Sequence, residues 1–213
     1  MLPQSRRNRV FMKVCHIVGA SPFKTKPTLS SGDLLIAADG GYDTLLAFGL
    51  TPDILVGDFD SIKNLPKEIK KIRFPEKKDE TDSYLAYLEG KKQGFSSFRI
   101  YGGTGGRADH TFANYCLLAK IREDGGRAEL IGDSELVFAV KDERVEIEGN
   151  RGGYFSVFAF GGEATGVSIH GSEYEAENVT LSPSFPLGVS NKFKSPSAEI
   201  SVESGTLIVI IQK

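Results

Sequence analysis

The chain has 213 residues, 40% of them hydrophobic, which suffices to bury the core of one large domain or two modest ones. Its 26 lysines and arginines nearly balance 28 aspartates and glutamates, and the net charge of -2 argues against a nucleic-acid partner. The apolar stretch 10–18 is too short to span a bilayer, so we expect no membrane association and a cytoplasmic location. The two cysteines, Cys15 and Cys116, lack metal-ligand spacing, and we expect both to be buried, reduced thiols.

The first half of the chain alternates short β-rich runs with segments of helical periodicity, which is typical of a parallel sheet flanked by helices. The expected strands are 14–18, 34–38, 54–56, 72–74, 98–101 and 129–131. Two sets of residues at helical spacing predict helices that pack on this sheet, namely Tyr84, Leu85, Tyr87 and Leu88, and then Phe112, Tyr115, Cys116 and Ala119.

After about residue 133 the helical period disappears, and short strands separated by glycine and proline turns predict an antiparallel β-sandwich. The expected strands are 145–147, 154–160, 167–169, 179–181, 198–202 and 207–211. We therefore expect an N-terminal α/β domain over residues 10–133, with a parallel sheet in a three-layer Rossmann-like arrangement. An antiparallel β-sandwich domain over residues 134–213 follows it.

Acidic and glycine-rich motifs follow four of the β-rich runs in the first half. They are Asp39-Gly40-Gly41, Gly57-Asp58-Phe59-Asp60-Ser61, Asp79-Glu80-Thr81-Asp82, and Gly102-Gly103-Thr104-Gly105-Gly106-Arg107-Ala108-Asp109-His110. Because the carboxyl ends of parallel strands share one edge of a sheet, the four motifs should converge on one crevice.

The carboxylates of these motifs form an oxygen-ligand set without a His or Cys pattern, which suits magnesium better than zinc. The set contains Asp58, Asp60 and Asp82, with Asp39, Asp79 or Asp109 as further candidates. Two carboxylates about 4 Å apart repel each other by roughly 4 kcal/mol at an effective dielectric constant of about 20. A divalent cation relieves that repulsion and also binds a polyphosphate.

The glycine-rich loop has the composition of a phosphate site. Four glycines in five residues let backbone N–H groups approach a ligand, and the following helix presents the positive end of its dipole. Arg107 can clamp a phosphate through its fork of donors. The spacing is neither that of a Walker A loop nor G-x-G-x-x-G. Taken singly, each motif is more often a turn or a helix cap, with Asp79 or Thr81 as N-cap of a helix near Asp82. Their joint placement at strand ends is what indicates a site.

In this order the four motifs closely resemble those of the thiamine pyrophosphokinase family. Gly188-Val189-Ser190-Asn191 and, more weakly, Gly171-Ser172-Glu173-Tyr174 resemble the family's thiamine-binding β-domain. The resemblance implies a homodimer that uses ATP and thiamine and produces thiamine diphosphate and AMP. Residues 10–133 would then bind ATP and Mg²⁺, and residues 134–213 would bind thiamine and form the dimer. Thiamine would bind where the β-domain of one subunit meets the catalytic crevice of the other.

The resemblance also implies roles for particular residues. Asp58, Asp60 and Asp82 would hold Mg²⁺ on the triphosphate, and Arg107 and Asp109 would complete the catalytic set. The implied nucleotide-binding residues are Asp39, Gly40, Gly41, Asp79, Thr81, Gly103, Thr104, Gly105, Gly106 and His110. The implied thiamine-binding residues are Tyr174, Ser190 and Asn191. The chain has no tryptophan, so Tyr174 is the candidate for a cation–π contact with thiamine.

Three alternatives remain open from the sequence. Asp58-Phe59-Asp60 after a β-run is similar to the nucleophile motif of haloacid-dehalogenase-like phosphatases, in which Asp58 would be phosphorylated, but that function leaves the glycine-rich loop and Asp39 unexplained. A pyrophosphokinase acting on another small alcohol, such as a hydroxymethyl-pterin, keeps the chemistry and changes the acceptor. A non-catalytic nucleotide sensor would keep the pocket alone.

Overall fold

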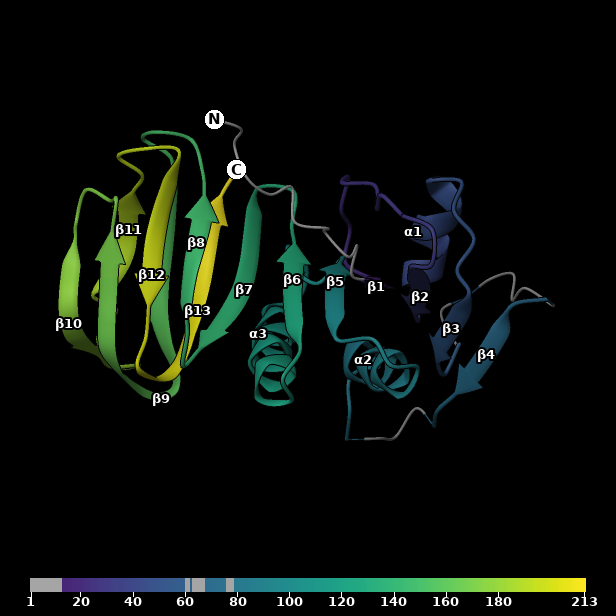
Figure 1. Cartoon of the computed structure of the whole chain (residues 1–213). Coiled ribbons are helices and arrows are strands. Elements are labelled where there is room, and N and C mark those ends of the chain that lie inside the picture. The colour runs from purple at the N-terminus through teal and green to yellow at the C-terminus, as the bar shows by residue number, and fades with distance from the viewer. Residues whose placement is uncertain (1–12, 60–61, 63–67, 76–78) are drawn as a thin grey trace, which may run out of the picture.

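The computed structural model describes residues 13–59, 62, 68–75 and 79–213. Its first half contains a parallel sheet with the strand order β4-β3-β2-β1-β5-β6 (Figure 1). The strands are β1 (Cys15–Val18), β2 (Leu34–Ala38), β3 (Ile54–Gly57), β4 (Lys70–Arg73), β5 (Ser97–Tyr101) and β6 (Arg127–Ile131). The helices are α1 (Gly41–Ala47), α2 (Asp82–Lys92) and α3 (Ala108–Glu123).

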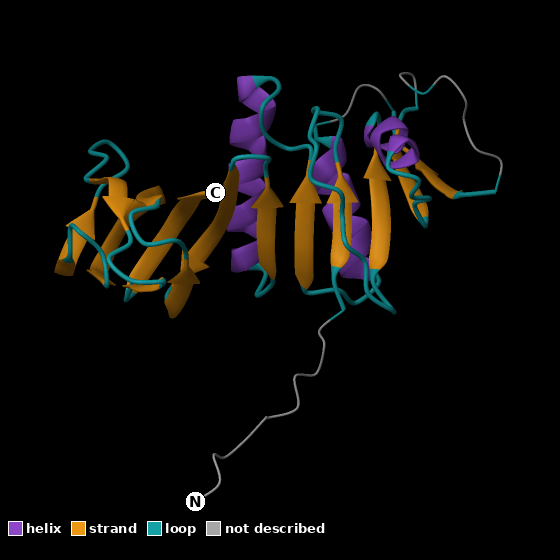
Figure 2. Ribbon diagram, turned by 90° about the horizontal axis from the view of Figure 1, so that it is seen from above, coloured by secondary structure: helices purple, strands orange, loops and turns teal. Residues whose placement is uncertain are grey.

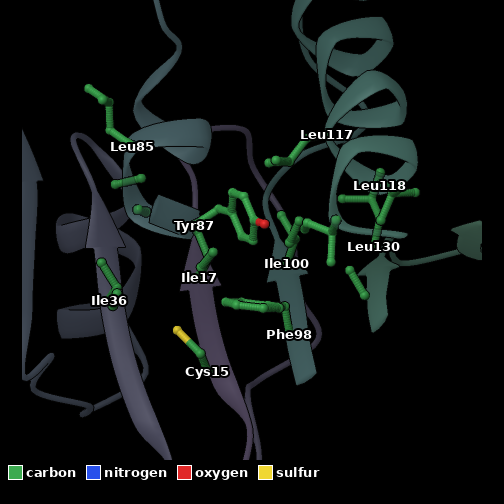
Figure 3. Packing of buried hydrophobic residues seen from close by; sticks show 14 of the residues in the cluster. Cys15, Ile17, Ile36, Leu85, Tyr87, Phe98, Ile100, Leu117, Leu118 and Leu130 are labelled. Atoms are coloured by element: carbon green, nitrogen blue, oxygen red, sulfur yellow. The ribbon is translucent and has the colours of Figure 1, made fainter. Parts of the chain in front are cut away.

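Helices cover both faces of this sheet. Tyr42 and Leu45 of α1 pack on one face, in a cluster with Val18 and Leu55. On the other face, α2 and α3 cover a larger core (Figure 3). Tyr87 of α2 lies there among Cys15, Ile17, Phe98 and Ile100, and α3 contributes Leu117 and Leu118. Every residue of β1, β2 and β3 is therefore buried, which accounts for the apolar sequences of β2 and β3. β1 also includes the buried His16.

The second half consists of antiparallel strands that continue the sheet in the order β6-β7-β13-β9-β12-β8, while β10 and β11 also pair with β9. They are β7 (Glu135–Lys141), β8 (Arg144–Glu148), β9 (Tyr154–His170), β10 (Ala176–Leu181), β11 (Gly188–Lys192), β12 (Ser197–Ser201) and β13 (Ser204–Gln212). The prediction of a parallel α/β part followed by an antiparallel β part is confirmed.

β9 joins two layers of the second half. Its first part, including Phe155 and Val157, pairs with β13 and β11, whereas its last part, including Ile169, pairs with β12 and β10. Gly161, with φ +76°, lies between these parts. The two strands expected over 154–160 and 167–169 are thus one strand, because the chain passes through the glycine pair without a turn that ends it. The buried side chains of both layers form one core.

The sheet crosses the boundary expected between residues 133 and 134 without a break. β6 pairs with β7 in the register Ile131↔Leu136, and Figure 2 shows the strands of both halves in one row. The core under α3 includes Val137 and Ala139 of β7 and Ile208 of β13. The division into domains 10–133 and 134–213 stays a prediction.

The expected packing faces of the helices require correction. Leu88, Phe112 and Cys116 are exposed. The buried face of α3 instead carries Leu117, Leu118, Ile121 and Asn114. At 3.6 residues per turn, Phe112 and Cys116 lie on the side of α3 opposite Leu118. The expectation of two buried thiols holds for Cys15 and is wrong for Cys116, although both cysteines are free. Within the described residues, no helix has both the length and the apolar character needed to cross a bilayer.

Candidate functional site

A cleft of about 370 Å³ opens at the carboxyl ends of β1, β2 and β5, between the first turns of α2 and α3. Several expected site residues line it, namely Asp39, Asp79, Thr81, Asp82 and His110. Its other lining residues are Gly19, Ala20, Ser21, Ala38, Glu80, Ser83, Gly102 and Asn114. The parallel topology therefore brings together three of the four motifs, as the shared sheet edge predicts.

The fourth motif begins beside this cleft. The N–H of Asp39 donates to the carbonyl of Val56 at 2.8 Å, and a Cβ added to Gly57 would lie 3.2 Å from the Cβ of Asp39. The ends of β2 and β3 thus touch, and Asp58 follows directly. The Arg73 guanidinium donates to the Asp58 carbonyl from Nε at 3.2 Å and from Nη2 at 3.1 Å. Asp60 lies outside the described residues.

The carboxylates around the cleft are oxygen donors of the kind that Mg²⁺ prefers. Asp39, Asp79, Glu80 and Asp82 line the cleft, and Asp58 directly follows the adjoining strand β3. Across the residues that the structure describes, no group of three or more His, Cys, Asp or Glu side chains is arranged to hold a metal ion. The chemistry of the donors fits magnesium, and the ligand set Asp58, Asp60 and Asp82 stays a prediction.

The first turn of α2 confirms the expected helix cap. Thr81 is the N-cap, and its Oγ accepts a hydrogen bond from the Tyr84 N–H at 3.2 Å. This bond uses a lone pair, so the Thr81 hydroxyl keeps its proton for another acceptor. The cap fixes the start of the helix and thereby places Asp82 in the first turn, at the edge of the cleft.

The glycines of the loop between β5 and α3 serve different purposes. A Cβ at Gly103 would lie 2.6 Å from Leu130 Cδ1 and 2.9 Å from Asn114 Nδ2, so close packing requires glycine there. Gly105 has φ +75° and no atom within 4 Å of an added Cβ. The half of the loop around Gly105 is therefore the half that faces open space, as a ligand-binding segment must.

Arg107 is paired with Asp109 rather than extended toward the cleft. Its Nε donates to Oδ1 at 3.1 Å and its Nη2 donates to Oδ2 at 2.6 Å, and both side chains are exposed. The hydrogen bond from Arg107 holds the pKa of Asp109 below its usual value, and the same bond raises the pKa of Arg107. Asp109 Oδ1 also accepts the His110 N–H at 3.0 Å. A phosphate would compete with Asp109 for the guanidinium.

Two parts of the cleft escaped the sequence analysis. The segment Gly19–Ser21 directly follows β1, as the four motifs follow their strands. Its position after a strand could therefore have identified it as part of the cleft. Its Ser21 N–H donates to the Gly102 carbonyl at 3.1 Å. Asn114 is a buried amide whose Nδ2 donates to the Gly103 carbonyl at 2.9 Å. The signal for Asn114 was a polar residue on the apolar face of α3.

Two of the three expected thiamine-binding residues line a second pocket, of about 510 Å³, in the β half. Tyr174 and Asn191 line it together with apolar residues of β9, β10 and β11, whereas Ser190 is exposed and is not among its lining residues. Tyr174 is 65% exposed. Asn191 is buried, and it accepts the Tyr174 N–H at 3.0 Å and donates to the Tyr174 carbonyl at 2.7 Å. Asn191 therefore fixes the backbone of Tyr174.

The two sites lie far apart within one chain, since β10 and β11 are at the opposite end of the molecule from β2 and β3 (Figure 1). A sheet edge that gathers carboxylates and a glycine-rich loop, with a second pocket on appended strands, is typical of α/β enzymes that bind a nucleotide polyphosphate and a second substrate.

Comparisons with known proteins identify the family. The model described as "Thiamin pyrophosphokinase, catalytic domain" matches residues 25–130, and the model "Thiamin pyrophosphokinase, vitamin B1 binding domain" matches residues 142–207. The thiamine pyrophosphokinase of Bacillus subtilis (strain 168) is 29% identical over 211 residues, which cover 93% of this chain and 98% of that protein. Thiamin pyrophosphokinase 1 of Caenorhabditis elegans is 27% identical, over 82% of this chain and 77% of its own.

Solved structures agree with these matches. The crystal structure of thiamine pyrophosphokinase from Bacillus subtilis superposes with a TM-score of 0.85 at 27% identity, over 94% of this chain and 99% of that one. The thiamin pyrophosphokinase from Geobacillus thermodenitrificans gives a TM-score of 0.79 at 27% identity, over 94% and 97%. The chain belongs to the thiamin pyrophosphokinase family.

Proposed function

We propose that this protein transfers the pyrophosphoryl group of ATP to the hydroxyl group of thiamine, which yields thiamine diphosphate and AMP. The observation that carries the proposal is the convergence of acidic motifs and a glycine-rich loop on one cleft, in a chain of this family. The family membership supports neither a phosphatase nor a different alcohol acceptor.

Within this proposal, Asp58, Asp60 and Asp82 hold Mg²⁺. When bound, the cation would neutralise charge on the triphosphate and orient it. The chain supplies further groups for the nucleotide: Gly105 presents open backbone, and the start of α3 presents its dipole. Arg107 reaches a phosphate by exchanging one or both of its bonds to Asp109.

The transfer itself requires alignment and a proton acceptor. The thiamine oxygen attacks the β-phosphorus, the bond to the AMP oxygen breaks, and the hydroxyl proton passes to a base. Asp82 is our candidate for that base, because it lies in the first turn of α2 at the cleft. Catalysis in such a reaction rests on holding both substrates in line and on neutralising the charge of the triphosphate.

We assign thiamine to the pocket beside Tyr174, whose exposed ring offers a face to the cationic thiazolium. Since this pocket and the cleft lie at opposite ends of the chain, the proposal includes a homodimer in which one subunit's pocket meets its partner's cleft. Exposed Phe185, Leu187 and Val189 next to the pocket support an interface there. The free thiols are in keeping with a cytoplasmic location.

Incubation with ATP, Mg²⁺ and thiamine tests the function, with products identified by mass spectrometry. We expect AMP and thiamine diphosphate in equal amounts, and no reaction after chelation of the metal. Formation of ADP with thiamine monophosphate, or hydrolysis of ATP without a thiamine product, would contradict the proposal.

A further inference from the structure

Glu135, the first residue of β7, contacts the glycine-rich loop at Thr104. Its Oε1 accepts a hydrogen bond from the Thr104 hydroxyl at 2.6 Å, and its Oε2 accepts one from the Ser134 hydroxyl at 2.5 Å. Glu135 and Thr104 are both half-buried. Hydrogen bonds from a hydroxyl to a carboxylate are short and about twice as strong as bonds between neutral groups.

The turn between β6 and β7 is shaped around this contact. A Cβ added to Gly132 would lie 2.1 Å from Glu135 Oε1 and 2.8 Å from Thr104 Oγ1. The Gly132 N–H donates to the Glu135 carbonyl at 3.0 Å, which closes the turn. Only glycine at position 132 leaves room for the carboxylate to reach the loop.

The loop is held by α3 as well. Asn114 of α3 donates to the Gly103 carbonyl at 2.9 Å, so adjacent loop residues are fastened to α3 and to β7. The next residue, Gly105, has open space around it. The loop therefore consists of an anchored part, Gly103 and Thr104, and an open part that begins at Gly105.

The contact also decides what Thr104 offers to a ligand. A hydroxyl group has one proton, and a carboxylate at neutral pH only accepts, so the Thr104 proton is directed to Glu135. The remaining lone pairs of Thr104 Oγ do not attract a phosphate. The expected nucleotide contact of the Thr104 side chain is thus replaced by an anchoring role.

We propose that Glu135 is a positioning residue: through Thr104 it fixes the glycine-rich loop so that Gly105, Gly106 and Arg107 meet the phosphates of the nucleotide. The inference rests on the proposed nucleotide-binding role of the cleft. It connects the loop to β7, which pairs with β13 of the antiparallel half, so the nucleotide loop takes its position partly from that half of the chain.

The test compares Thr104→Val, which removes the hydroxyl at constant shape, with Thr104→Ser, which keeps it. Thr25→Val is a matched control, because Thr25 Oγ donates to Asp133 at 3.2 Å, on the same turn but away from the loop. Calorimetry measures binding of Mg²⁺ with a non-hydrolysable ATP analogue, and steady-state kinetics give KM for ATP and for thiamine. Thermal unfolding checks that each variant is folded.

We expect Thr104→Val and Glu135→Ala each to weaken binding of the analogue and raise the KM for ATP by about tenfold, the loss of one hydrogen bond to a charged group. The KM for thiamine should stay unchanged. Thr104→Ser should restore most of the affinity, and Thr25→Val should behave as wild type. The double variant Thr104→Val/Glu135→Ala should bind the analogue no more weakly than whichever single variant has the lower affinity, since both substitutions remove the same contact.

Wild-type nucleotide affinity in Thr104→Val would overturn the inference, as would additive losses in the double variant or equal losses in Thr25→Val. If Glu135→Ala does not fold, the comparison of Thr104→Val with Thr104→Ser decides alone. A wild-type protein that binds the analogue but makes no thiamine diphosphate refutes the proposed reaction, and the binding comparison still tests the inference. A wild-type protein that binds no nucleotide overturns both.

Discussion

Asp39 and Asp58 bring two carboxyl groups to the ends of adjacent strands. Asp39 has φ 45°, a left-handed conformation that is uncommon outside glycine, and its N–H is bonded to β3. Phe59, which follows Asp58, is buried and lies 5.7 Å beneath the Arg73 guanidinium. A buried aromatic side chain thus anchors the backbone next to Asp58.

Asp58→Asn should reduce turnover by at least about tenfold at saturating Mg²⁺, because an amide replaces an anionic ligand. The free energy of unfolding without metal should be unchanged or slightly higher, since repulsion among carboxylates is relieved. Coupled AMP-release assays and urea denaturation measure the two effects. Asp43→Asn, an exposed aspartate in the first turn of α1, is the control. Wild-type turnover in Asp58→Asn would place the metal elsewhere.

Arg107→Lys should raise the KM for ATP by about tenfold, since lysine keeps the charge but loses the planar fork that matches two oxygen atoms. In the structure the Arg107 guanidinium donates two hydrogen bonds to the two carboxylate oxygens of Asp109, which shows that its geometry suits a partner with two oxygen atoms. Steady-state kinetics test this, with Arg144→Lys, an exposed arginine of β8 paired with Glu199, as control. An unchanged KM in Arg107→Lys would remove the guanidinium from the phosphate site.

At the scale of elements, α1 shows how closely a helix approaches the sheet. A Cβ added to Gly41, its first residue, would lie 1.9 Å from the Val18 carbonyl oxygen of β1. Gly41 is buried against this backbone, and its expected contact with the nucleotide stays a prediction. At the other end of α1, Gly49 has φ +69° and open space around it.

Gly41→Ala should therefore lower the free energy of unfolding by at least about 3 kcal/mol, because backbone atoms must move to admit the methyl group. Gly49→Ala should cost only about 1–2 kcal/mol, the strain of a left-handed conformation for alanine. Urea denaturation of both variants makes the comparison within one helix. Equal decreases in the free energy of unfolding for the two variants would mean that the close approach of Gly41 to the β1 backbone adds no cost beyond that of backbone conformation.

Asp124 connects the ends of α2 and α3. Its Oδ2 accepts from Lys91 Nζ at 2.8 Å and from the Tyr87 hydroxyl at 2.5 Å, and its Oδ1 accepts from Lys120 Nζ at 2.9 Å. The hydrogen bond from Lys91, followed by those from Tyr87 and Lys120, holds the pKa of Asp124 well below its ordinary value of 3.8. The ionised carboxylate is therefore part of the folded state.

Asp124→Asn should lower the free energy of unfolding by about 2 kcal/mol at pH 7. Because the folded pKa is the lower one, this stabilisation is complete above the unfolded pKa, about 3.9, and is lost as the pH falls below it. The difference between wild type and variant should be constant from pH 8 to pH 5 and shrink below about pH 4. Urea denaturation across this range measures it. Glu123→Gln, a neighbouring exposed carboxyl, serves as control, and a pH-independent difference would contradict the assignment.

At the scale of the whole molecule, one continuous sheet carries the cleft in its parallel half and the pocket beside Tyr174 in its antiparallel half. Figure 2 shows the strands of this sheet in one row. Because the strands around the pocket lie at the opposite end of the molecule from those around the cleft, the pocket of one chain does not adjoin the cleft of the same chain. Two copies related by a two-fold axis would form two composite sites, each with a cleft from one subunit and a pocket from the other.

Mixed dimers test this arrangement. Asp82→Ala removes a cleft carboxylate, and the double variant Tyr174→Ala/Ser190→Ala removes exposed groups of the β half while it leaves the buried Asn191 in place. Each variant alone should be nearly inactive. Equal amounts refolded together should recover about a quarter of wild-type activity, because half of the randomly paired dimers contain one intact site of two. Verified mixed dimers without recovery would show that thiamine binds within one subunit.

The sequence by itself determined the alternation of strands and helices along the α/β part and the convergence of the motifs that follow its strands. Continuous apolar runs between helical segments identify strands that are covered on both faces, and parallel strands place their following loops on one edge. Local chemistry also sufficed for the cap at Thr81, because an N-cap depends on residues only a few positions apart.

Only the tertiary structure decided the contacts between distant segments. The bond from Thr104 to Glu135 joins residues 31 positions apart, and the strands β7 and β11 and the helix α1 were not predicted. On α3, too, the sequence did not reveal that Cys116 is exposed and that Asn114 is buried. Periodicity tells which residues share a side of a helix or strand, but packing alone determines which element covers that side and which polar groups meet there.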